Sequence, residues 1–354
     1  MTPPPRIRAV ATATPPYVMT QESTRDCARQ VFADRTRDFD RMAPIFTNAG
    51  IDQRNSSVPM DWYYQPKSWS ERNAAFLDSA LDVIERATRT ALARAQLEPH
   101  DIDAIVAVSS TGVATPSLDA LLMERMGLRR DVQRLPVFGL GCAGGVLGLA
   151  RAASWAQAMP GKNVLLVVVE LCALQFRHGD LSKANIVATA LFGDGGGAVL
   201  LRADPPGPTA SDRRGAVLGS AEHTWPASLD IMGWRVEDDG LGVIFSQSIP
   251  TLVRSRFGEV VRAFLTAQGM ELDALDGTIC HPGGAKVLEA LQEVFAPVKA
   301  GFQEAWEVLR DHGNMSAATM LFVLERRWQQ GVTGRHLVTA LGPGFTAALA
   351  LVEL

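Results

Sequence analysis

A cysteine between small residues stands at the start of a helix-like run in FGLGCAGGVLGL, residues 138–149. Glycines on both sides of Cys142 let the backbone turn sharply and let a substrate approach closely. A cysteine at a helix N-terminus lies at the positive end of the helix dipole, which favours the nucleophilic thiolate over the thiol. We therefore expect Cys142 to be a nucleophile; taken alone, it could also be a small buried cysteine in a glycine-rich turn.

Two further motifs carry side chains that could assist such a nucleophile. His281, in CHPGG at 280–284, follows a predicted strand, and catalytic groups of α/β sheets gather at the carboxyl ends of strands. Asn314 lies in GNMSAA at 313–318, where a second helix is predicted. His281 as imidazolium can hold a thiolate, and together with Asn314 it can donate hydrogen bonds to an oxygen that gains negative charge. A structural histidine and a helix N-cap are the alternatives for these two residues taken singly.

The elements that would position these residues recur in the same order in two parts of the chain. Three segments have an echo: residues 95–103 in 267–276, the Cys142 helix with the strand from 163 in the Asn314 helix with the strand from 335, and GDGGGA at 193–198 in GPGFTA at 342–347. Three echoes in one order predict a duplicated α/β unit whose sheets pack around buried helices. A Pro/Gly/charged stretch at 205–214 suggests the boundary, with halves of 1–210 and 211–354.

Composition and charge exclude several classes of protein. The chain has 354 residues, 47% of them hydrophobic, and a formal net charge of -4 with scattered Lys and Arg, which argues against a nucleic-acid partner. Its four cysteines are far apart and form no CxxC pair, so we expect neither a metal site nor a disulfide framework. The most apolar run, 164–176, is interrupted by Glu170 and is shorter than the ~20 residues of a membrane span. With no signal peptide evident, we expect a cytoplasmic protein.

The motifs GCAGG, HPGG and GNMSAA, together with ALFGDG at 190–195 and GPG at 342–344, resemble those of type III polyketide synthases. This is the chalcone-synthase-like branch of the thiolase superfamily, and the pairing of WP at 225–226 with MGW at 232–234 is similar to its bacterial members. The resemblance runs essentially from end to end. It implies an α/β thiolase-like fold, a duplicated αβαβα layered unit with two mixed sheets around buried helices. It also implies a homodimer that uses coenzyme A thioesters and needs no metal or organic cofactor.

The resemblance further implies an activity. Cys142 would accept a starter acyl group from an acyl-CoA, and His281 and Asn314 would bind the thioester carbonyl of malonyl-CoA. Decarboxylation would give an enolate that attacks the Cys142-bound acyl group. Repeated extension and cyclisation would release a pyrone or an aromatic ring. A fatty acyl starter would give alkylpyrones or alkylresorcinols, while a malonyl starter leading to a naphthalene-type product, or an aromatic starter, stays open.

Other residues are assigned to the pocket by the same resemblance. Phe192 corresponds to the gatekeeper phenylalanine between the CoA tunnel and the cavity, and Phe245 to the second gatekeeper. Cys172 and Gln175 occupy positions that shape product choice in relatives. Thr115 departs from the plant pattern, which has at this position a methionine that crosses the dimer interface.

A basic lip should meet the phosphates of coenzyme A, because Arg and Lys bind phosphate well. Arg54 is the candidate, with Lys67 and Arg72 beside it, and solvated surface charge is the alternative for each.

Two other functions are weighed against this one. A β-ketoacyl synthase III-like enzyme would perform one condensation with the same three residue types, but its relatives usually carry glutamine and asparagine where this chain has Pro282 and Gly283. A non-catalytic thiolase-fold partner would have no reason to keep a nucleophile, a histidine and an asparagine in these motifs.

Overall fold

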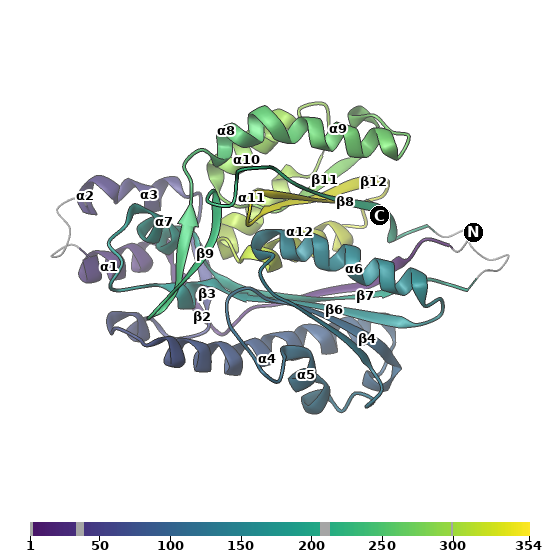
Figure 1. The fold of residues 1–354 in the computed structure, drawn as a ribbon, viewed down its shortest axis with the longest axis horizontal. Helices are drawn as coiled ribbons and strands as arrows, with labels where there is room; N and C mark the ends of the chain where they lie inside the picture. The colour runs from purple at the N-terminus through teal and green to yellow at the C-terminus, as the bar shows by residue number, and fades with distance from the viewer. Residues whose placement is uncertain (1–2, 33–38, 206–212, 299) are drawn as a thin grey trace.

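Five alternating layers of helices and strands build the molecule, as the computed structural model shows for residues 3–32, 39–205, 213–298 and 300–354 (Figure 1). One outer layer covers the strands of the N-terminal half, the middle layer lies between the strands of the two halves, and the other outer layer covers the strands of the C-terminal half. The layers contain, in that order, α4 (Trp69–Ala95) and α5 (Leu118–Met126); α6 (Gly144–Ala158) and α12 (Thr319–Gln329); and α8 (Ile249–Leu252), α9 (Gly258–Ala267) and α10 (Ala285–Val294). α11 (Phe302–His312) packs against α12 and shares its core with the middle layer.

The strands repeat one pattern in the two halves. In the N-terminal half the order is β5-β4-β6-β7-β1, and in the C-terminal half it is β11-β12-β13-β8. Four strands of each half correspond, β4-β6-β7-β1 and β11-β12-β13-β8. In both sets the first two strands are parallel, and the other neighbouring pairs are antiparallel. This topology agrees with the duplication predicted from the sequence. The strands are β1 (Arg6–Ala13), β4 (Ile102–Val108), β5 (Gln133–Val137), β6 (Asn163–Leu171), β7 (Asp194–Arg202), β8 (Ala216–Thr224), β11 (Gly277–Cys280), β12 (Arg335–Gly342) and β13 (Thr346–Glu353).

The two sets of strands are joined into one sheet, whereas two separate sheets were expected. β1 and β8 pair through a single register pair, Arg6 with Ala216, so that nine strands form one hydrogen-bonded order. The backbone N–H of Ile7 also donates to the carbonyl of Gly215 at 2.8 Å. The predicted boundary between the halves falls at 206–212, outside the described residues.

The middle helices are largely buried, as helices between two sheets must be, and only their C-terminal parts contain exposed residues. Ten of the fifteen residues of α6 are buried, and its first turn contains two glycines. A Cβ on Gly145 would lie 2.3 Å from the carbonyl oxygen of Ala317, so only glycine lets α6 approach the turn before α12. The start of α6 and the start of α12 therefore meet in the centre of the molecule.

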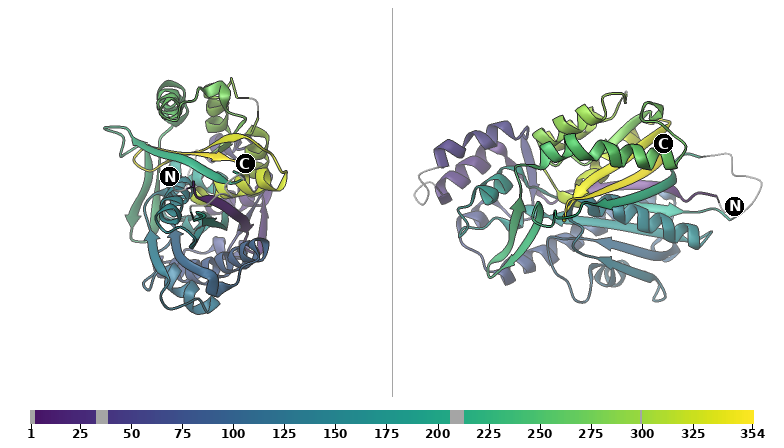
Figure 2. Two further views of the ribbon diagram at one scale, coloured as in Figure 1. Left: turned by 90° about the vertical axis from the view of Figure 1, so that its right-hand side faces the viewer. Right: turned by 45° about the horizontal axis from the view of Figure 1, so that its top comes forward.

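A group of short elements lies at the end of the molecule opposite the two termini (Figures 1 and 2). The segment 50–66 contains a strand and a 3₁₀ turn there. Within the described ranges, no helix has the length and apolar character needed to cross a bilayer. The elements at this end are α1 (Gln21–Phe32), α2 (Phe39–Met42), α3 (Pro44–Asn48), α7 (Lys183–Leu191), β2 (Tyr17–Thr20), β3 (Gln53–Ser56), the turn η1 (Met60–Tyr64), and the hairpin of β9 (Met232–Glu237) and β10 (Gly240–Phe245).

Candidate active site

Cys142 lies in a 3₁₀ turn, Gly141–Ala143, immediately before α6. Gly141 has a φ of +45°, and a Cβ there would lie 2.6 Å from the ring of Pro343, so this position requires glycine. The Ser110 hydroxyl, at the end of β4, accepts hydrogen bonds from the backbone N–H groups of Gly139 (3.2 Å) and Gly141 (3.0 Å). The turn that presents the thiol is thus held by packing against Pro343 and by hydrogen bonds to Ser110.

His281 and Asn314 reach the same place from the C-terminal half. His281 follows β11, and its backbone N–H donates to the carbonyl of Thr339 at 2.9 Å. Its side chain is buried, and neither ring nitrogen has a partner within the described residues. Asn314 donates from Nδ2 to the carbonyl of Gly283 at 3.0 Å and accepts at Oδ1 from the N–H of Ser316 at 2.8 Å. Since an amide has two N–H donors, one donor of Asn314 stays available to a ligand.

These three side chains border one space, which we call the inner cavity. It consists of two adjoining hollows that share Cys142, Asn314, Met232 and Phe245, and His281 lines one of them. The structure therefore brings together the three residues that the sequence motifs singled out. It also places Phe245, the predicted second gatekeeper, in the same wall.

Burial decides the protonation of the inner cavity. It raises the pKa of the Cys142 thiol to about 11, an effect that a hydrogen bond with the Ser316 side chain only partly offsets. Burial also lowers the pKa of His281 to about 4. The expected lowering of the thiol pKa at a helix N-terminus is thus outweighed in the unliganded protein. With pKa values shifted in these directions, both groups are uncharged at neutral pH in the unliganded protein.

Glu170, at the carboxyl end of β6, lies buried beneath the site. Its Oε2 accepts from the backbone N–H of Ser110 at 3.0 Å and from the Thr111 hydroxyl at 2.7 Å. Burial raises its pKa to about 8, and its charge contributes to the raised pKa of both Cys142 and Cys172. The sequence reasoning gave this residue no role, although a carboxylate within an apolar strand was a visible signal.

A second space, the outer cavity, lies beyond Phe192. Phe192 lines both cavities, and its ring contacts that of Trp234 with centroids 5.7 Å apart. Cys172 and Gln175 are buried and line the outer cavity. The other lining residues are mostly apolar. They come from β2, α1, β3, η1, the turn after β6, α7 and the hairpin: Met19, Thr24, Cys27, Arg54, Met60, Tyr63, Ala173, Phe176, Asn185, Ala188, Thr189, Trp234 and Val243.

Phe192 is tied by its backbone to Asn314. The N–H of Asn314 donates to the carbonyl of Leu191 at 2.8 Å, and the N–H of Gly193 donates to the carbonyl of Asn314 at 3.0 Å. A Cβ on Gly193 would lie 2.3 Å from the carbonyl oxygen of His312, so glycine is required for this approach. His312 is the last residue of α11.

Arg54, predicted to bind coenzyme A phosphates, does not lie on a basic surface lip. Arg54 is 1% exposed, and burial lowers its pKa to about 10. Its guanidinium donates to the carbonyls of Thr189 (2.9 Å), Ala190 (2.8 Å) and Phe192 (3.0 Å), which lie at the end of α7. Carbonyls at a helix end need donors, and a buried arginine supplies them.

The other two residues of the predicted lip have different surroundings from each other. Arg72 is equally buried and donates to the carbonyl of Leu174 at 2.6 Å. Lys67 stays at the surface, 3.7 Å from Glu71. Thr115 is exposed and lines neither cavity.

Comparison with known proteins gives a match along the whole chain. Residues 12–214 match a family model described as FAE1/type III polyketide synthase-like protein, and residues 217–352 match the C-terminal domain of chalcone and stilbene synthases. A 1,3,6,8-tetrahydroxynaphthalene synthase of Streptomyces peucetius subsp. caesius is 38% identical, covering 98% of this chain and 92% of that protein. A putative chalcone synthase of Bacillus subtilis is 36% identical, covering 98% and 97%.

A solved structure agrees with these matches. The 1,3,6,8-tetrahydroxynaphthalene synthase of Streptomyces coelicolor A3(2) superposes with a TM-score of 0.89 at 26% identity, covering 98% of this chain and 99% of that one. The duplicated five-layer architecture is therefore the thiolase-like fold that the sequence predicted.

Proposed function

Since this chain belongs to the type III polyketide synthase family, whose members are malonyl-CoA-dependent condensing enzymes, we propose that Cys142, His281 and Asn314 are its catalytic residues. One observation carries this assignment: a thiol, an imidazole with two unpartnered nitrogens and a carboxamide with a free N–H border one buried cavity. Three separate motifs supply these groups.

The loading step follows from the protonation of the pair. The Cys142 sulfur attacks the carbonyl of an acyl-CoA while its proton passes to His281, because a thiolate and an imidazolium together offset the burial cost that each would bear alone. The carbon–sulfur bond to coenzyme A then breaks, and the departing thiolate takes the proton from His281. The acyl group stays on Cys142 as a thioester.

The extension step uses the same donors on malonyl-CoA. The bond to the carboxylate breaks, carbon dioxide leaves, and the electron pair moves onto the thioester oxygen as an enolate. An N–H of His281 and the free N–H of Asn314 donate to this oxygen, and donors aimed at a developing charge are worth about 10²–10³ in rate each. The enolate carbon attacks the Cys142-bound carbonyl, expels the sulfur and lengthens the chain by two carbons.

For the starter, we propose an apolar acyl-CoA, whose chain would occupy the outer cavity. Support comes from the lining, in which Met19, Met60, Phe176 and Val243 offer apolar and adaptable side chains. Such a starter would give alkylpyrones or alkylresorcinols. A malonyl starter leading to a naphthalene product is the second candidate, favoured by the tetrahydroxynaphthalene synthase that is 38% identical.

The test is product analysis by mass spectrometry with malonyl-CoA and a panel of starters. Purified protein is incubated with malonyl-CoA alone, and with short, long-chain and aromatic acyl-CoA. Products with two or more extensions support the proposal, and the preferred starter separates the two candidates. A single condensation onto an acyl carrier protein would instead indicate a β-ketoacyl synthase III-like enzyme. No product, with a Cys142 no more reactive toward iodoacetamide than free cysteine, would indicate a non-catalytic partner.

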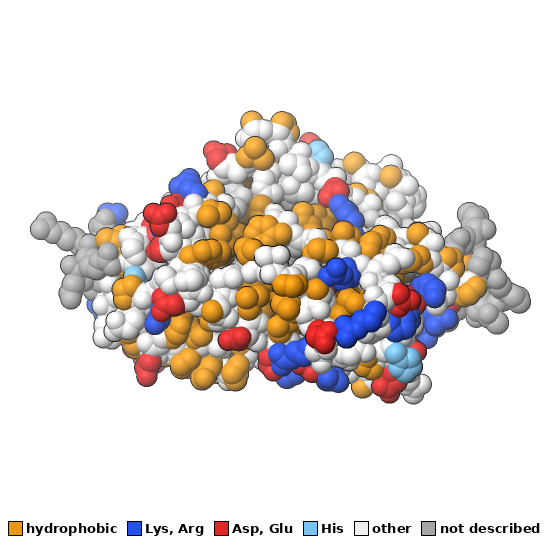
Figure 3. Space-filling model, turned by 60° about the horizontal axis from the view of Figure 1, so that its bottom comes forward, with side chains coloured by type: hydrophobic (Ala, Val, Ile, Leu, Met, Phe, Trp, Pro, Cys, Tyr) orange, Lys and Arg blue, Asp and Glu red, His pale blue; other side chains and the backbone are white. Residues whose placement is uncertain are grey.

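We also propose that the enzyme works as a homodimer and needs no group beyond its coenzyme A substrates. β5 is an edge strand, and near it Val113 is 49% and Phe138 60% exposed. Figure 3 shows a face on which apolar side chains form a broad central band with charges toward its margin. Such surfaces mark protein interfaces. Light scattering of the wild type and of Phe138→Glu tests this: a wild-type monomer would contradict it.

The proposed division of labour assigns the nucleophile to residues 1–210 and the two hydrogen-bond donors to 211–354. Its support is the repeated strand order, since β4-β6-β7-β1 and β11-β12-β13-β8 correspond one to one.

A further inference from the structure

The hairpin β9–β10 reaches from one half of the molecule to the other. Its base belongs to the C-terminal half, where the N–H of Gly344 donates to the carbonyl of Met232 at 3.2 Å. Met232 and Phe245, at the base, line the inner cavity, while Trp234 and Val243, farther along, line the outer cavity as well. The position of the hairpin therefore sets the space on both sides of Phe192.

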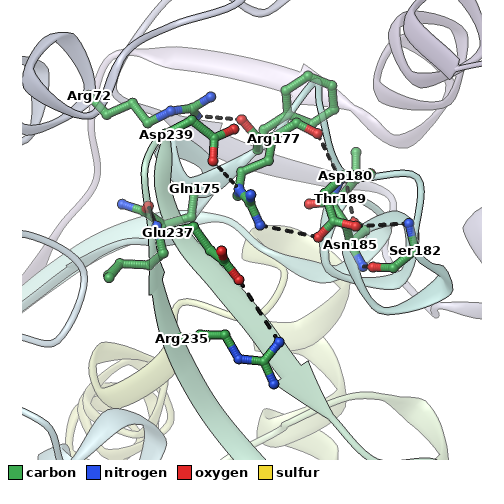
Figure 4. Close-up of polar contacts among 12 residues, drawn as sticks. Arg72, Gln175, Arg177, Asp180, Ser182, Asn185, Thr189, Arg235, Glu237 and Asp239 are labelled. Carbon is green, nitrogen blue, oxygen red and sulfur yellow. Dashed lines mark hydrogen bonds and ion pairs between the residues drawn. The ribbon is translucent and has the colours of Figure 1, made fainter.

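The tip of the hairpin is held by the N-terminal half (Figure 4). Arg177 donates from Nε to Oδ1 of Asp239 at 2.6 Å. Beside this pair, Gln175 accepts from the backbone N–H of Leu241 at 3.2 Å and donates to the carbonyl of Thr111 at 2.9 Å. One ion pair and one bridging amide thus attach the tip to the segment that follows β6.

The hairpin needs this attachment. Among the described strands, β9 and β10 pair only with each other, and an isolated two-stranded hairpin is marginally stable in water. Its outer face is open, with Val236 79% exposed.

Arg177 lies close against the hairpin backbone, since a Cβ on Gly242 would lie 2.9 Å from Nη1 of Arg177. It is also held from its other side by Asp180 at 3.3 Å. The contacts with the hairpin backbone and Asp180 therefore hold the guanidinium in place independently of Asp239. The Arg177 side chain is only 14% exposed. Such a pair costs little to order and is less screened by solvent than a surface ion pair.

We propose that Arg177 and Asp239 form a positioning pair that sets the passage between Phe192 and Trp234 and thereby the length of the polyketide. The pair lines neither cavity and acts through the hairpin residues Trp234 and Val243. This inference rests on the proposed function, because it concerns how often the same site repeats its condensation. When the pair is broken, only the amide of Gln175 still attaches the tip, the hairpin position shifts, and chain growth ends at a different length.

The test compares Asp239→Asn with Glu237→Gln. Glu237 is a matched control because it lies on the same hairpin, its side chain is 35% exposed like that of Asp239, and its partner Arg235 is 3.9 Å away at the surface. With the best starter, Asp239→Asn is expected to change the ratio of longer to shorter products by about threefold, the effect of losing an ion pair of ordinary strength. Glu237→Gln should leave the ratio unchanged. Malonyl-CoA decarboxylation, which depends on the inner cavity, should stay within about twofold of wild type.

The exchanged double variant Arg177→Asp/Asp239→Arg should restore part of the wild-type ratio if the pair acts through its attraction. An unchanged ratio in Asp239→Asn overturns the proposal. So does an equal loss of every product together with a lower melting temperature, because that is the result of a merely structural role. If Asp239→Asn does not fold, Arg177→Lys, which keeps the charge and loses the fixed geometry, is read in the same way. A wild type that makes no polyketide refutes the proposed function, whereas an active wild type with unresponsive variants refutes only the positioning pair.

Discussion

The two cavities that meet at Phe192 are built in different ways. The groups of the inner cavity are held by backbone hydrogen bonds from both halves, such as those of His281 to Thr339 and of Asn314 to Leu191. The outer cavity is walled by side chains of short helices and a hairpin, held by the long side chains of Arg54 and Arg177. Backbone contacts fix the chemistry, while side-chain contacts fix the space, so the space can change while the chemistry is kept.

The strongest test of this contrast is Cys142→Ala. Polyketide formation should fall by about a thousandfold or more, because the acyl group has no nucleophile to bind. Decarboxylation of malonyl-CoA should persist, because His281 and Asn314 still border the cavity. Both reactions are followed by mass spectrometry and by release of carbon dioxide. Wild-type product levels would show that the inner cavity is not the site.

A second test removes the proton acceptor with His281→Gln. Burial raises the pKa of Cys142 to about 11, so without an imidazole to take the proton the thiol should stay protonated to alkaline pH. Alkylation by iodoacetamide at neutral pH should slow by about tenfold or more, because no imidazole takes the proton from the attacking sulfur. Rates of mass labelling are measured from neutral to alkaline pH. An unchanged profile would mean that His281 does not set the reactivity of Cys142.

Opening the boundary between the cavities should have a milder effect on rate. Phe192→Ala joins the two spaces, since Phe192 lines both. We expect decarboxylation to change by less than about tenfold, because the backbone at Phe192 keeps its hydrogen bonds to Asn314, while the product pattern shifts. Product profiles and decarboxylation rates are compared with wild type. A loss of decarboxylation as large as that from a missing hydrogen-bond donor would contradict the prediction that the two cavities act separately.

The smallest expected effect is on stability. The pKa of Glu170 is raised by burial to about 8 in the folded protein, above its ordinary value, so the folded state binds the proton more tightly than the unfolded state does. Its contribution to stability is therefore present at low pH and is lost as pH rises toward about 8, by up to about 1.4 kcal/mol per pH unit. In Glu170→Gln this loss is absent. The melting temperature of the variant relative to wild type should thus rise between pH 5 and 8, and a constant difference would contradict the prediction.

The inner cavity was predictable from the sequence because its constraints are local. Glycines such as Gly141 and Gly145 mark positions where a Cβ would clash, and they flank the nucleophile within a few residues. The duplicated strand order could be predicted for a similar reason, since each echo lies within one segment.

The family resemblance pointed to Phe192, Cys172 and Gln175, which line the outer cavity. The contacts that hold this cavity together could not be predicted, because they join residues that are distant along the chain. Arg54 resembles any surface arginine until its carbonyl partners, more than 130 residues away, are seen. The same holds for Asp239, whose partner Arg177 is 62 residues away. The strand Gln53–Ser56 is equally hard to predict, because it pairs with a four-residue strand and has no apolar alternation of its own.

The hydrogen bonds between the main chains at Phe192 and Asn314 constrain how such an enzyme can diversify. Any replacement of the phenyl ring leaves those bonds in place, so new specificities can arise by point substitution at a single codon. An inserted or deleted residue between 190 and 195 would instead disrupt these bonds and displace Asn314, and we expect activity to be lost. This segment can therefore accept changes of side chain at position 192 but not changes in its length.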